Sequence, residues 1–254
     1  MNLIKNRLIK IFANICKTFC YVYHFFLPKK RFTIPAYRAP RKKASADQRI
    51  PRIIWQTNFT DQATLPVYLN YLFNGWLSPT YEQRFVSTEA RGEFIKENYP
   101  AEIFEAYDKI QIGAGQADYW RVLVLNTLGG IYIDIDAHTV SSLDKIIKPT
   151  DTEAYIQMRD SSLSNYFIAS VPDNPNLQAV AKAIKENIDE RKNTYSAFTM
   201  TGPGVFNSIL DVENLHKVFY RDTCIQGSFT NEYFQYIDKP QGKWTKDKTP
   251  ILKD

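Results

Sequence analysis

Two aspartates at the end of an apolar run carry the strongest chemical signal in the sequence. In residues 131–136, three isoleucines alternate with Tyr132, Asp134 and Asp136, a period of two that is typical of a β-strand. An extended backbone would place both carboxylates on one side of the chain. Like charges at close range raise each other's pKa unless a cation lies near them. Because Mg²⁺ and Mn²⁺ prefer oxygen ligands, Asp134 and Asp136 are predicted to hold such an ion against a leaving diphosphate.

A helix is predicted immediately before this strand, and it carries an acid and a base on one face. Asp118 and Arg121 lie three residues apart, so their side chains are neighbours on a helix. Gly129 and Gly130 follow and would end the helix. Arg121 could donate to a phosphate or sugar oxygen of a ligand. The alternative for this pair is a surface ion pair, which contributes little to stability.

The preceding segments predict the sheet that must position both pairs. Residues 51–57 form a short apolar run that ends in polar residues, as in a buried strand. A strand is also expected around residues 85–87, and helices are expected around residues 67–74, 89–99 and 101–107. Alternating strands and helices favour an α/β fold with a largely parallel sheet. Ligands bind beyond the carboxyl ends of strands in such sheets, which places Trp55 near the expected site.

This order of elements resembles a family of D-x-D sugar transferases. The family includes yeast-type initiating α-1,6-mannosyltransferases, bacterial capsule and lipooligosaccharide transferases, and the glucosylating domains of large clostridial toxins. The matching residues lie between positions 51 and 140 in the family's order: Ile54-Trp55, Ala117-Asp118, Arg121, Leu125 or Leu128, Gly129-Gly130, Tyr132 and Asp134-x-Asp136. Residues 165–170 resemble the family's donor-site segment, and Thr201-Gly202-Pro203-Gly204 resembles its turn near the acceptor. The family's C-terminal Ser-Trp pair has no clear counterpart, since the chain has Lys243-Trp244-Thr245.

The resemblance implies a GT-A fold, in which a mixed, mostly parallel sheet is flanked by helices. It also implies an enzyme that moves a hexose from a UDP- or GDP-sugar to a glycan or glycolipid with retention of configuration. Such an enzyme would act in cell-surface polysaccharide or lipooligosaccharide synthesis. Its cofactor would be Mn²⁺ or Mg²⁺.

The resemblance further implies a role for each matching residue. Trp55 would stack on the nucleobase, while Asp118 and Arg121 would hold donor-sugar hydroxyls. Asp134 would contact the ribose or donor sugar, and Asp136 would ligate the metal together with Asp134. Tyr132 and Asn165 would complete the donor site. Catalysis would rest on Asp134, Asp136 and Arg121, the last lying near the diphosphate.

The charge of the chain is divided unevenly. The 254 residues have a net charge of +5, yet the first 46 contain eleven Lys and Arg residues and no Asp or Glu. The remaining residues contain 21 basic and all 27 acidic residues, so their net charge is −6. Nucleic-acid affinity rests mainly on the neutralisation of phosphates. The acidic remainder therefore argues against a nucleic-acid partner.

The basic tail begins with an amphipathic segment. Apolar side chains recur at helical spacing and share one face: Ile4, Leu8, Ile11, Phe12, Ile15, Phe19, Val22 and Phe26. Lys10 and Lys17 interrupt any membrane-spanning stretch, so a helix lying in the membrane interface is predicted. The basic run that follows would attract anionic lipid. The alternative is a helix that docks on the body of the protein or on a partner.

These features divide the chain into three predicted parts. Residues 1–28 would form a membrane-associating helix, residues 29–49 a basic linker, and residues 50–254 the GT-A domain. We expect a cytoplasmic protein on the inner face of the membrane, or a Golgi-type membrane anchor if the source is eukaryotic.

Two other functions fit the pattern less completely. A haloacid-dehalogenase-type phosphatase also has Asp-x-Asp after an apolar strand, but it needs Thr or Val where this chain has His138. A glycan-binding protein of the same fold without activity is the second alternative. His138 itself is either a cover for the site or a structural residue.

Overall fold

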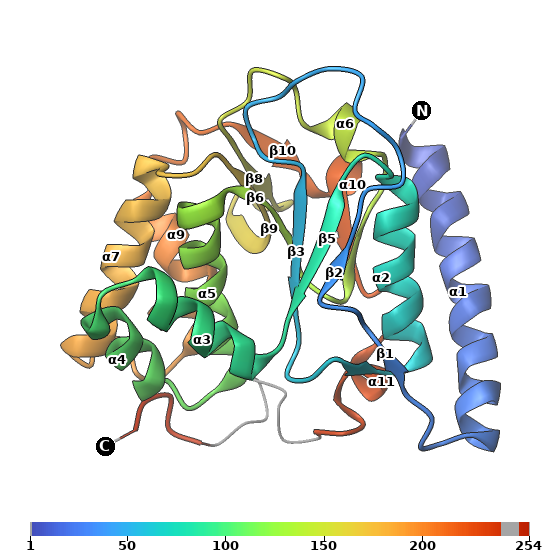
Figure 1. Ribbon diagram of the computed structural model, residues 1–254, viewed down its shortest axis with the longest axis horizontal. Helices are drawn as coiled ribbons and strands as arrows, with labels where there is room; N and C mark the ends of the chain where they lie inside the picture. Colours follow the sequence, from blue (N-terminus) through green and yellow to red (C-terminus); the bar gives the residue numbers. More distant parts are fainter. Residues whose placement is uncertain (1, 240–248, 254) are drawn as a thin grey trace.

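The computed structural model describes residues 2–239 and 249–253, and in these residues a seven-stranded sheet forms the centre of the molecule (Figure 1). In spatial order its strands are β10 (Lys217–Phe219), β8 (Glu153–Gln157), β9 (Leu163–Ser170), β6 (Gly130–Ile133), β3 (Ile53–Thr57), β5 (Glu82–Val86) and β2 (Tyr37–Arg38). Five of these strands point the same way, while β9 and β2 run antiparallel to their neighbours. The predicted α/β fold with a mostly parallel sheet is confirmed.

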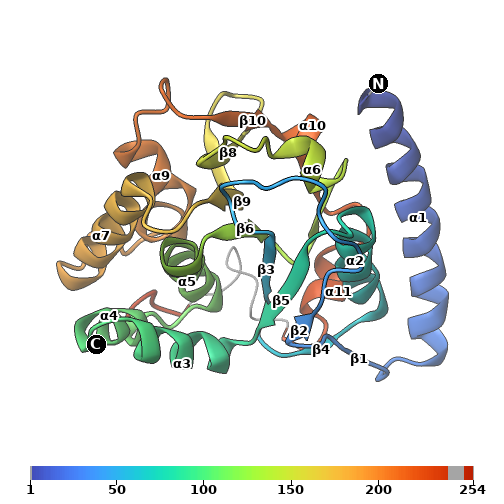
Figure 2. The same cartoon turned by 45° about the horizontal axis from the view of Figure 1, so that its top comes forward.

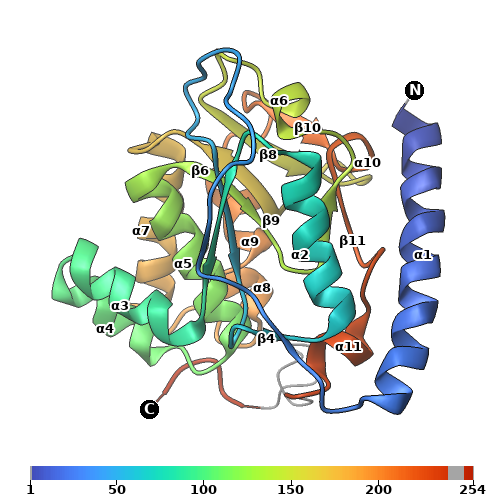
Figure 3. The same cartoon turned by 45° about the vertical axis from the view of Figure 1, so that its right-hand side comes forward.

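Helices cover both faces of this sheet (Figure 2, Figure 3). One face is covered by α3 (Thr88–Asn98), α4 (Ala101–Lys109), α5 (Gly113–Leu128), α7 (Pro175–Asp189), α8 (Ala197–Met200) and α9 (Pro203–Ile209). The other face is covered by α2 (Leu65–Leu77), α6 (Leu143–Ile146) and α10 (Tyr220–Thr223). The short α11 (Glu232–Tyr236) lies near the start of α2, and α1 (Asn2–Phe26) runs antiparallel to α2 on its outer side (Figure 1).

The chain path determines where a ligand can bind. Along the sheet, β5 lies on one side of β3 and β6 lies on the other, with α3, α4 and α5 connecting β5 to β6. The order of the strands therefore reverses at β3. In an open α/β sheet, a crevice forms at the carboxyl ends of the strands where the order reverses. The loops after β3, β5 and β6 meet at this edge.

Helix α5 and the two glycines after it position Asp118 and Arg121 beside this crevice. Residues Asp118 to Leu125 of α5 are all buried, so the helix contacts protein on every side. Gly129 has a φ of 63° and Gly130 a φ of 105°, in the region that favours glycine. A Cβ on Gly130 would lie 2.9 Å from the carbonyl oxygen of Ile53. The chain can therefore turn from α5 into β6, close against β3, because residue 130 has no side chain.

Two local features differ from the sequence predictions. β6 ends at Ile133, and the Ala137 amide donates to the carbonyl oxygen of Asp134 at 2.9 Å, so Asp134 and Asp136 lie in a turn. The extended backbone predicted through Asp136 is wrong, because the chain turns after Asp134, whose amide still donates to the carbonyl oxygen of Tyr166 in β9 at 2.9 Å. β7 (Ala137–Thr139) then pairs with β11 (Cys224–Gln226) outside the main sheet.

The basic segment after α1 is also more ordered than a linker. It contributes β1 (Phe32–Thr33), which pairs with β4 (Gln62–Ala63), and it contributes β2 at the edge of the main sheet. The predicted helix at the N-terminus is present as α1. Within the described residues, no helix is both long enough and apolar enough to cross a membrane.

Replacement of Gly130 by alanine should test the turn into β6. We expect Gly130→Ala to lower the free energy of unfolding by about 2–4 kcal/mol, because alanine disfavours this φ and its Cβ would contact the β3 backbone. Gly92→Ala is the control, since Gly92 lies within α3 and its Cβ would meet other atoms only at 3.6 Å or more. Urea denaturation should show the control neutral or slightly stabilised. Equal stability of both variants would contradict a requirement for glycine at residue 130.

Candidate active site

A pocket of about 460 Å³ lies where the carboxyl ends of β3, β5 and β6 meet. This volume is within the range of small-molecule sites. The lining comes from the loops after these strands, from α5, β9 and α8, and from the region of α11. The predicted residues that line it are Asp118, Arg121, Tyr132, Asp134, Asp136 and Asn165. The fold thus brings six of the seven predicted site residues together.

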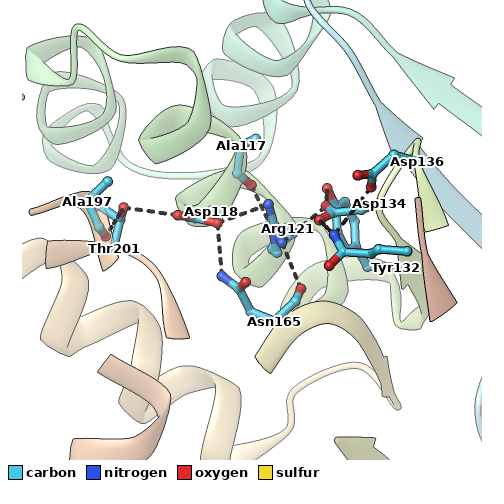
Figure 4. A network of polar contacts seen from close by, with 10 residues as sticks. Ala117, Asp118, Arg121, Tyr132, Asp134, Asp136, Asn165, Ala197 and Thr201 are labelled. Atoms are coloured by element: carbon cyan, nitrogen blue, oxygen red, sulfur yellow. Dashed lines mark hydrogen bonds and ion pairs between the residues drawn. The ribbon is translucent and has the colours of Figure 1, made fainter. Parts of the chain in front are cut away.

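Arg121 connects helix α5 to the turn that contains Asp134 and Asp136, called the aspartate turn below (Figure 4). Its Nη2 lies 2.9 Å from Oδ1 of Asp118, and its Nη1 lies 3.3 Å from Oδ1 of Asp134. Nη1 also donates to the carbonyl oxygen of Asn165 at 2.7 Å, and the guanidinium lies 4.3 Å from the ring centre of Tyr132. Arg121 is only 5% exposed and Asp118 only 8%. The alternative of a surface ion pair is therefore wrong.

Both carboxylate oxygens of Asp118 are held in place (Figure 4). Asn165, from β9, donates its side-chain amide to Oδ1 at 2.8 Å. Thr201, in the turn before α9, donates its hydroxyl to Oδ2 at 3.3 Å. A Cβ on Gly202 would lie 3.2 Å from the same Oδ2, so this turn approaches Asp118 closely. The segments predicted on the donor and acceptor sides therefore converge on one carboxylate.

The two aspartates of the turn share a hydrogen-bond donor. The side-chain amide of Gln226 lies 3.1 Å from Oδ2 of Asp134 and 3.3 Å from Oδ1 of Asp136. The hydroxyl of Tyr132 donates to Oδ1 of Asp134 at 2.7 Å. Burial raises the pKa of Tyr132 well above its usual value, so its phenol stays protonated and can donate. Burial, and then the charge of Asp134, raises the pKa of Asp136 to about 7.

The residues at this turn fit a hard divalent cation. Three carboxylates, those of Asp118, Asp134 and Asp136, lie around a single guanidinium, that of Arg121. An oxygen of Asp134 and an oxygen of Asp136 both lie within hydrogen-bond distance of the same amide nitrogen, so the two carboxylates converge on one point. In the described part of the chain, no three His, Cys, Asp or Glu side chains gather into a complete metal cage. Two carboxylates completed by water or phosphate oxygens are typical of Mg²⁺ and its substitutes.

Trp55 is the predicted site residue that does not line the pocket. It is 4% exposed, and its Nε1 donates to the carbonyl oxygen of Gly129 at 2.9 Å. Its rings lie against Trp120 and the guanidinium of Arg84. The reason is its register: Trp55 pairs with Tyr132 and lies within β3 rather than at its end. This position leaves no open face for a nucleobase, whereas the half-buried Phe59, four residues later, does line the pocket.

His138 is not among the residues that line the pocket. His138 is 1% exposed and packs edge-on against the rings of Phe73 and Phe229, so the structural interpretation of this histidine is confirmed. Its Nδ1 lies 3.0 Å from the carbonyl oxygen of Thr139. Trp244 lies outside the described residues.

Several residues in the pocket carry no recognisable signal in the sequence. They are Phe59, Arg91, Gln226, Gln235, Tyr236 and Lys239. Gln226 reaches the aspartate turn because β11 pairs antiparallel with β7, which begins directly after that turn. This pairing joins segments about 90 residues apart in the sequence. A single polar residue in a three-residue strand gives no periodicity from which the contact could be predicted.

Comparison with known proteins agrees with these features. Residues 66–153 match the family described as "Glycosyltransferase sugar-binding region containing DXD motif". This segment is therefore similar to the D-x-D glycosyltransferase sugar-binding family. The matched range includes Asp118, Arg121, Asp134 and Asp136, so the resemblance inferred from the motifs is confirmed. A phosphatase is disfavoured by the same match.

The similar curated proteins also bear transferase names. The chain is 34% identical over 89 residues to the uncharacterized glycosyltransferase L373 of Acanthamoeba polyphaga mimivirus, which is 34% of this chain and 36% of that protein. It is 29% identical over 181 residues to the mannosyl phosphorylinositol ceramide synthase CSH1 of Saccharomyces cerevisiae, which is 69% of this chain and 45% of that protein. It is 26% identical over 163 residues to the initiation-specific alpha-1,6-mannosyltransferase of Candida albicans, which is 59% of this chain and 42% of that protein. The chain thus spans between a third and a half of these D-x-D relatives.

A solved structure supports the fold. The PaToxG glycosyltransferase superimposes with a TM-score of 0.53 over 83% of this chain and 80% of that chain, at 16% sequence identity. At this identity the likeness concerns the fold alone. The predicted GT-A-like architecture is confirmed.

Cation binding at the aspartate turn should be visible in thermal stability. Mn²⁺ should raise the Tm of the wild-type protein, because an ion that binds only the folded state stabilises it. Asp136→Asn should lose this shift, while Glu97→Gln, which changes an exposed acid on α3, should keep it. Without metal, Asp136→Asn should unfold at a higher temperature than wild type at pH 8, since it removes a half-buried charge beside Asp134. A Mn²⁺ shift that survives in Asp136→Asn would place the ion elsewhere.

Proposed function

We propose that this protein is a metal-dependent glycosyltransferase that moves a hexose from a UDP- or GDP-sugar to a glycan or glycolipid. The observation that carries the proposal is the buried set in which Arg121 joins Asp118 to the aspartate turn at the wall of one pocket. The D-x-D match and the mannosyltransferase names of the relatives support the same reaction class. We further propose a place in the synthesis of cell-surface polysaccharide or lipooligosaccharide.

Each residue of the set has a task in this reaction. Asp136 and Asp134 would hold Mn²⁺ or Mg²⁺, which when bound supplies positive charge to the leaving diphosphate. Asp118 is fixed through both oxygens, so it can accept hydrogen bonds from donor-sugar hydroxyls at the cost of little further ordering. Arg121 contributes a positive charge that is held in place before the donor binds. Tyr132 keeps Asp134 oriented through its hydroxyl.

We also propose that transfer proceeds with retention of configuration. An inverting enzyme needs a carboxylate that is available to take the proton from the acceptor hydroxyl. Asp118, Asp134 and Asp136 are each held by hydrogen-bond donors, which makes them poor candidates for that base. Glu232 on α11 is a further carboxylate of the pocket lining. Nuclear magnetic resonance of the first-formed product should show the donor's anomeric configuration, and inversion would direct attention to Glu232.

Loss of the cation should abolish the reaction. With a panel of nucleotide-sugars and no added acceptor, we expect donor hydrolysis that stops in excess chelator and returns with Mn²⁺. Asp136→Asn should lower the rate by at least about a hundredfold, because it removes a ligand of the charge that stabilises the leaving group. Glu97→Gln serves again as the control. Full activity in excess chelator would contradict the metal dependence, and no activity with any donor would favour a non-catalytic glycan-binding protein.

The nucleobase should be bound by Phe59 rather than by Trp55. Phe59→Ala should weaken donor binding about tenfold or more, since stacking on an aromatic ring contributes about 1–3 kcal/mol per base. Trp55→Phe should leave the donor Kd within about twofold and lower the free energy of unfolding by about 1–3 kcal/mol, because it removes the hydrogen bond to Gly129. Calorimetric titration with nucleotide diphosphate measures both. Weakened binding in Trp55→Phe alone would restore the stacking predicted from the sequence.

A further inference from the structure

Helix α1 packs on the rest of the protein through its polar face, whereas an ordinary surface helix packs through its apolar face. Its buried side chains are polar or small: Asn6, Ala13, Cys20 and His24. The side chain of Asn6 donates to the carbonyl oxygen of Arg221, and Nζ of Lys17 donates to that of Gly227 at 2.9 Å. Near the end of the helix, Nε2 of His24 accepts from the Leu65 amide at 3.1 Å. An amphipathic helix normally turns its apolar stripe toward the core, and α1 turns it away.

The apolar face of α1 is consequently the outer face. The eight apolar side chains that share this face are between 53% and 73% exposed, and they are Ile4, Leu8, Ile11, Phe12, Ile15, Phe19, Val22 and Phe26. Phe12, at the edge of the face, also packs edge-on against the ring of Phe229. Figure 3 shows the helix at the edge of the molecule, with the rest of the protein on one side of it. A helix of 25 residues is about 38 Å long. A continuous apolar surface of this length marks an interaction site.

Charge beside the apolar face points to a lipid surface as the occupant. Arg7 and Lys10 are exposed on the helix, and Lys29 and Lys30 are exposed directly after it. The first 46 residues contain no acidic residue that could neutralise them. In a symmetric pair of copies, such a face would bring the same cations together, which is unfavourable. An anionic bilayer complements both the apolar stripe and the flanking cations.

The short helix α11 connects this face to the pocket. The ring of Tyr21 on α1 lies 4.6 Å from that of Phe234 and 6.0 Å from that of Tyr233, both on α11. Three other residues of α11, Glu232, Gln235 and Tyr236, line the pocket. α11 therefore lies between α1 and the pocket, so α1 and α11, each about 10 Å across, separate the outer apolar face from the pocket. A membrane that binds α1 would lie about two helix diameters from the pocket, roughly 20 Å.

We propose that α1 binds the surface of an anionic bilayer through its outward apolar face and holds the pocket beside the membrane, where the acceptor is a lipid-linked sugar. The assignment of the acceptor rests on the proposed transferase function, whereas the binding of α1 to lipid does not. The polar contacts of α1 with α2, α10 and the segment after β11 make the helix part of the body. The membrane therefore sets the orientation of the whole domain, not merely its location.

Vesicle flotation with the full chain tests the surface. Wild-type protein should float with vesicles containing 30% phosphatidylglycerol, and it should float far less with neutral phosphatidylcholine or at high salt. Ile15→Glu should weaken binding to the anionic vesicles by at least about tenfold, since Ile15 is 64% exposed on the apolar face. Asn14→Glu is the matched control, because it adds the same charge at the neighbouring exposed residue off that face. It should weaken binding by no more than about threefold.

Two results would overturn the lipid-binding assignment. One is equal binding of wild type and Ile15→Glu to anionic vesicles, which would remove the apolar face from the contact. The other is a wild-type protein that ignores vesicles but elutes as a dimer, with Ile15→Glu eluting as a monomer. That result would assign the face to a second copy. Circular dichroism and thermal melting should show both variants folded, because residues 14 and 15 are exposed.

A comparison of two acceptors tests the second half of the proposal. Dodecyl mannoside in anionic vesicles and methyl mannoside in solution serve as probes, each with the donor that wild type hydrolyses. Ile15→Glu should lower transfer to the vesicle acceptor about tenfold and leave donor hydrolysis and transfer to the soluble acceptor unchanged. Equal transfer to the vesicle acceptor by both proteins would overturn the lipid-linked acceptor. Absence of donor hydrolysis in wild type would instead overturn the proposed function, and the flotation result would stand.

Discussion

The buried guanidinium of Arg121 is the interaction on which the geometry of the site depends. A charge that is withdrawn from water is costly unless it is paired and hydrogen-bonded. Arg121 satisfies this requirement with Asp118 on its own helix, with Asp134 beyond β6 and with the backbone of β9. α5, β6 and β9 cannot shift relative to one another without leaving that charge unpaired. The aspartate turn therefore has a fixed position relative to Asp118 before any ligand binds.

The same cluster contains more negative charge than its arginine can neutralise. The raised pKa of Asp136 reflects this excess, since burial and the charge of Asp134 both disfavour a second carboxylate. Such an arrangement lowers the stability of the protein, and a divalent cation bound there would relieve the repulsion. Destabilising charge of this kind is expected where function requires it. The amide nitrogen of Gln226 lies within hydrogen-bond distance of both carboxylates, so their oxygens converge on one point.

Helix α1 is held to the protein by polar contacts, whereas the core is held by apolar packing. Its polar contacts with the body are specific hydrogen bonds, while its apolar side chains are left outside. Polar docking fixes the rotation of the helix about its axis, and that rotation decides which face remains available. Because α11 contacts α1 and also lines the pocket, α11 connects the available face to the site.

The sequence by itself determined the features that depend on local spacing. The alternation in residues 131–136, the three-residue spacing of Asp118 and Arg121, and the glycines at 129 and 130 predicted a helix, a turn and a strand in the right order. Helical spacing likewise predicted α1 and its apolar face. These features follow from the periods of helix and strand, which act over a few residues. The D-x-D resemblance rests on the same short patterns.

Tertiary structure decided which of these side chains meet and which are buried. Trp55 had the residue type and approximate position for the site, yet the register of β3 against β6 places it in the core. Gln226 gave no signal, and pairing of β11 with β7 brings it to both aspartates. The two faces of α1 were evident from the sequence, but only packing shows that the polar one is docked. Register and docking depend on contacts between distant segments, and local periodicity does not encode those contacts.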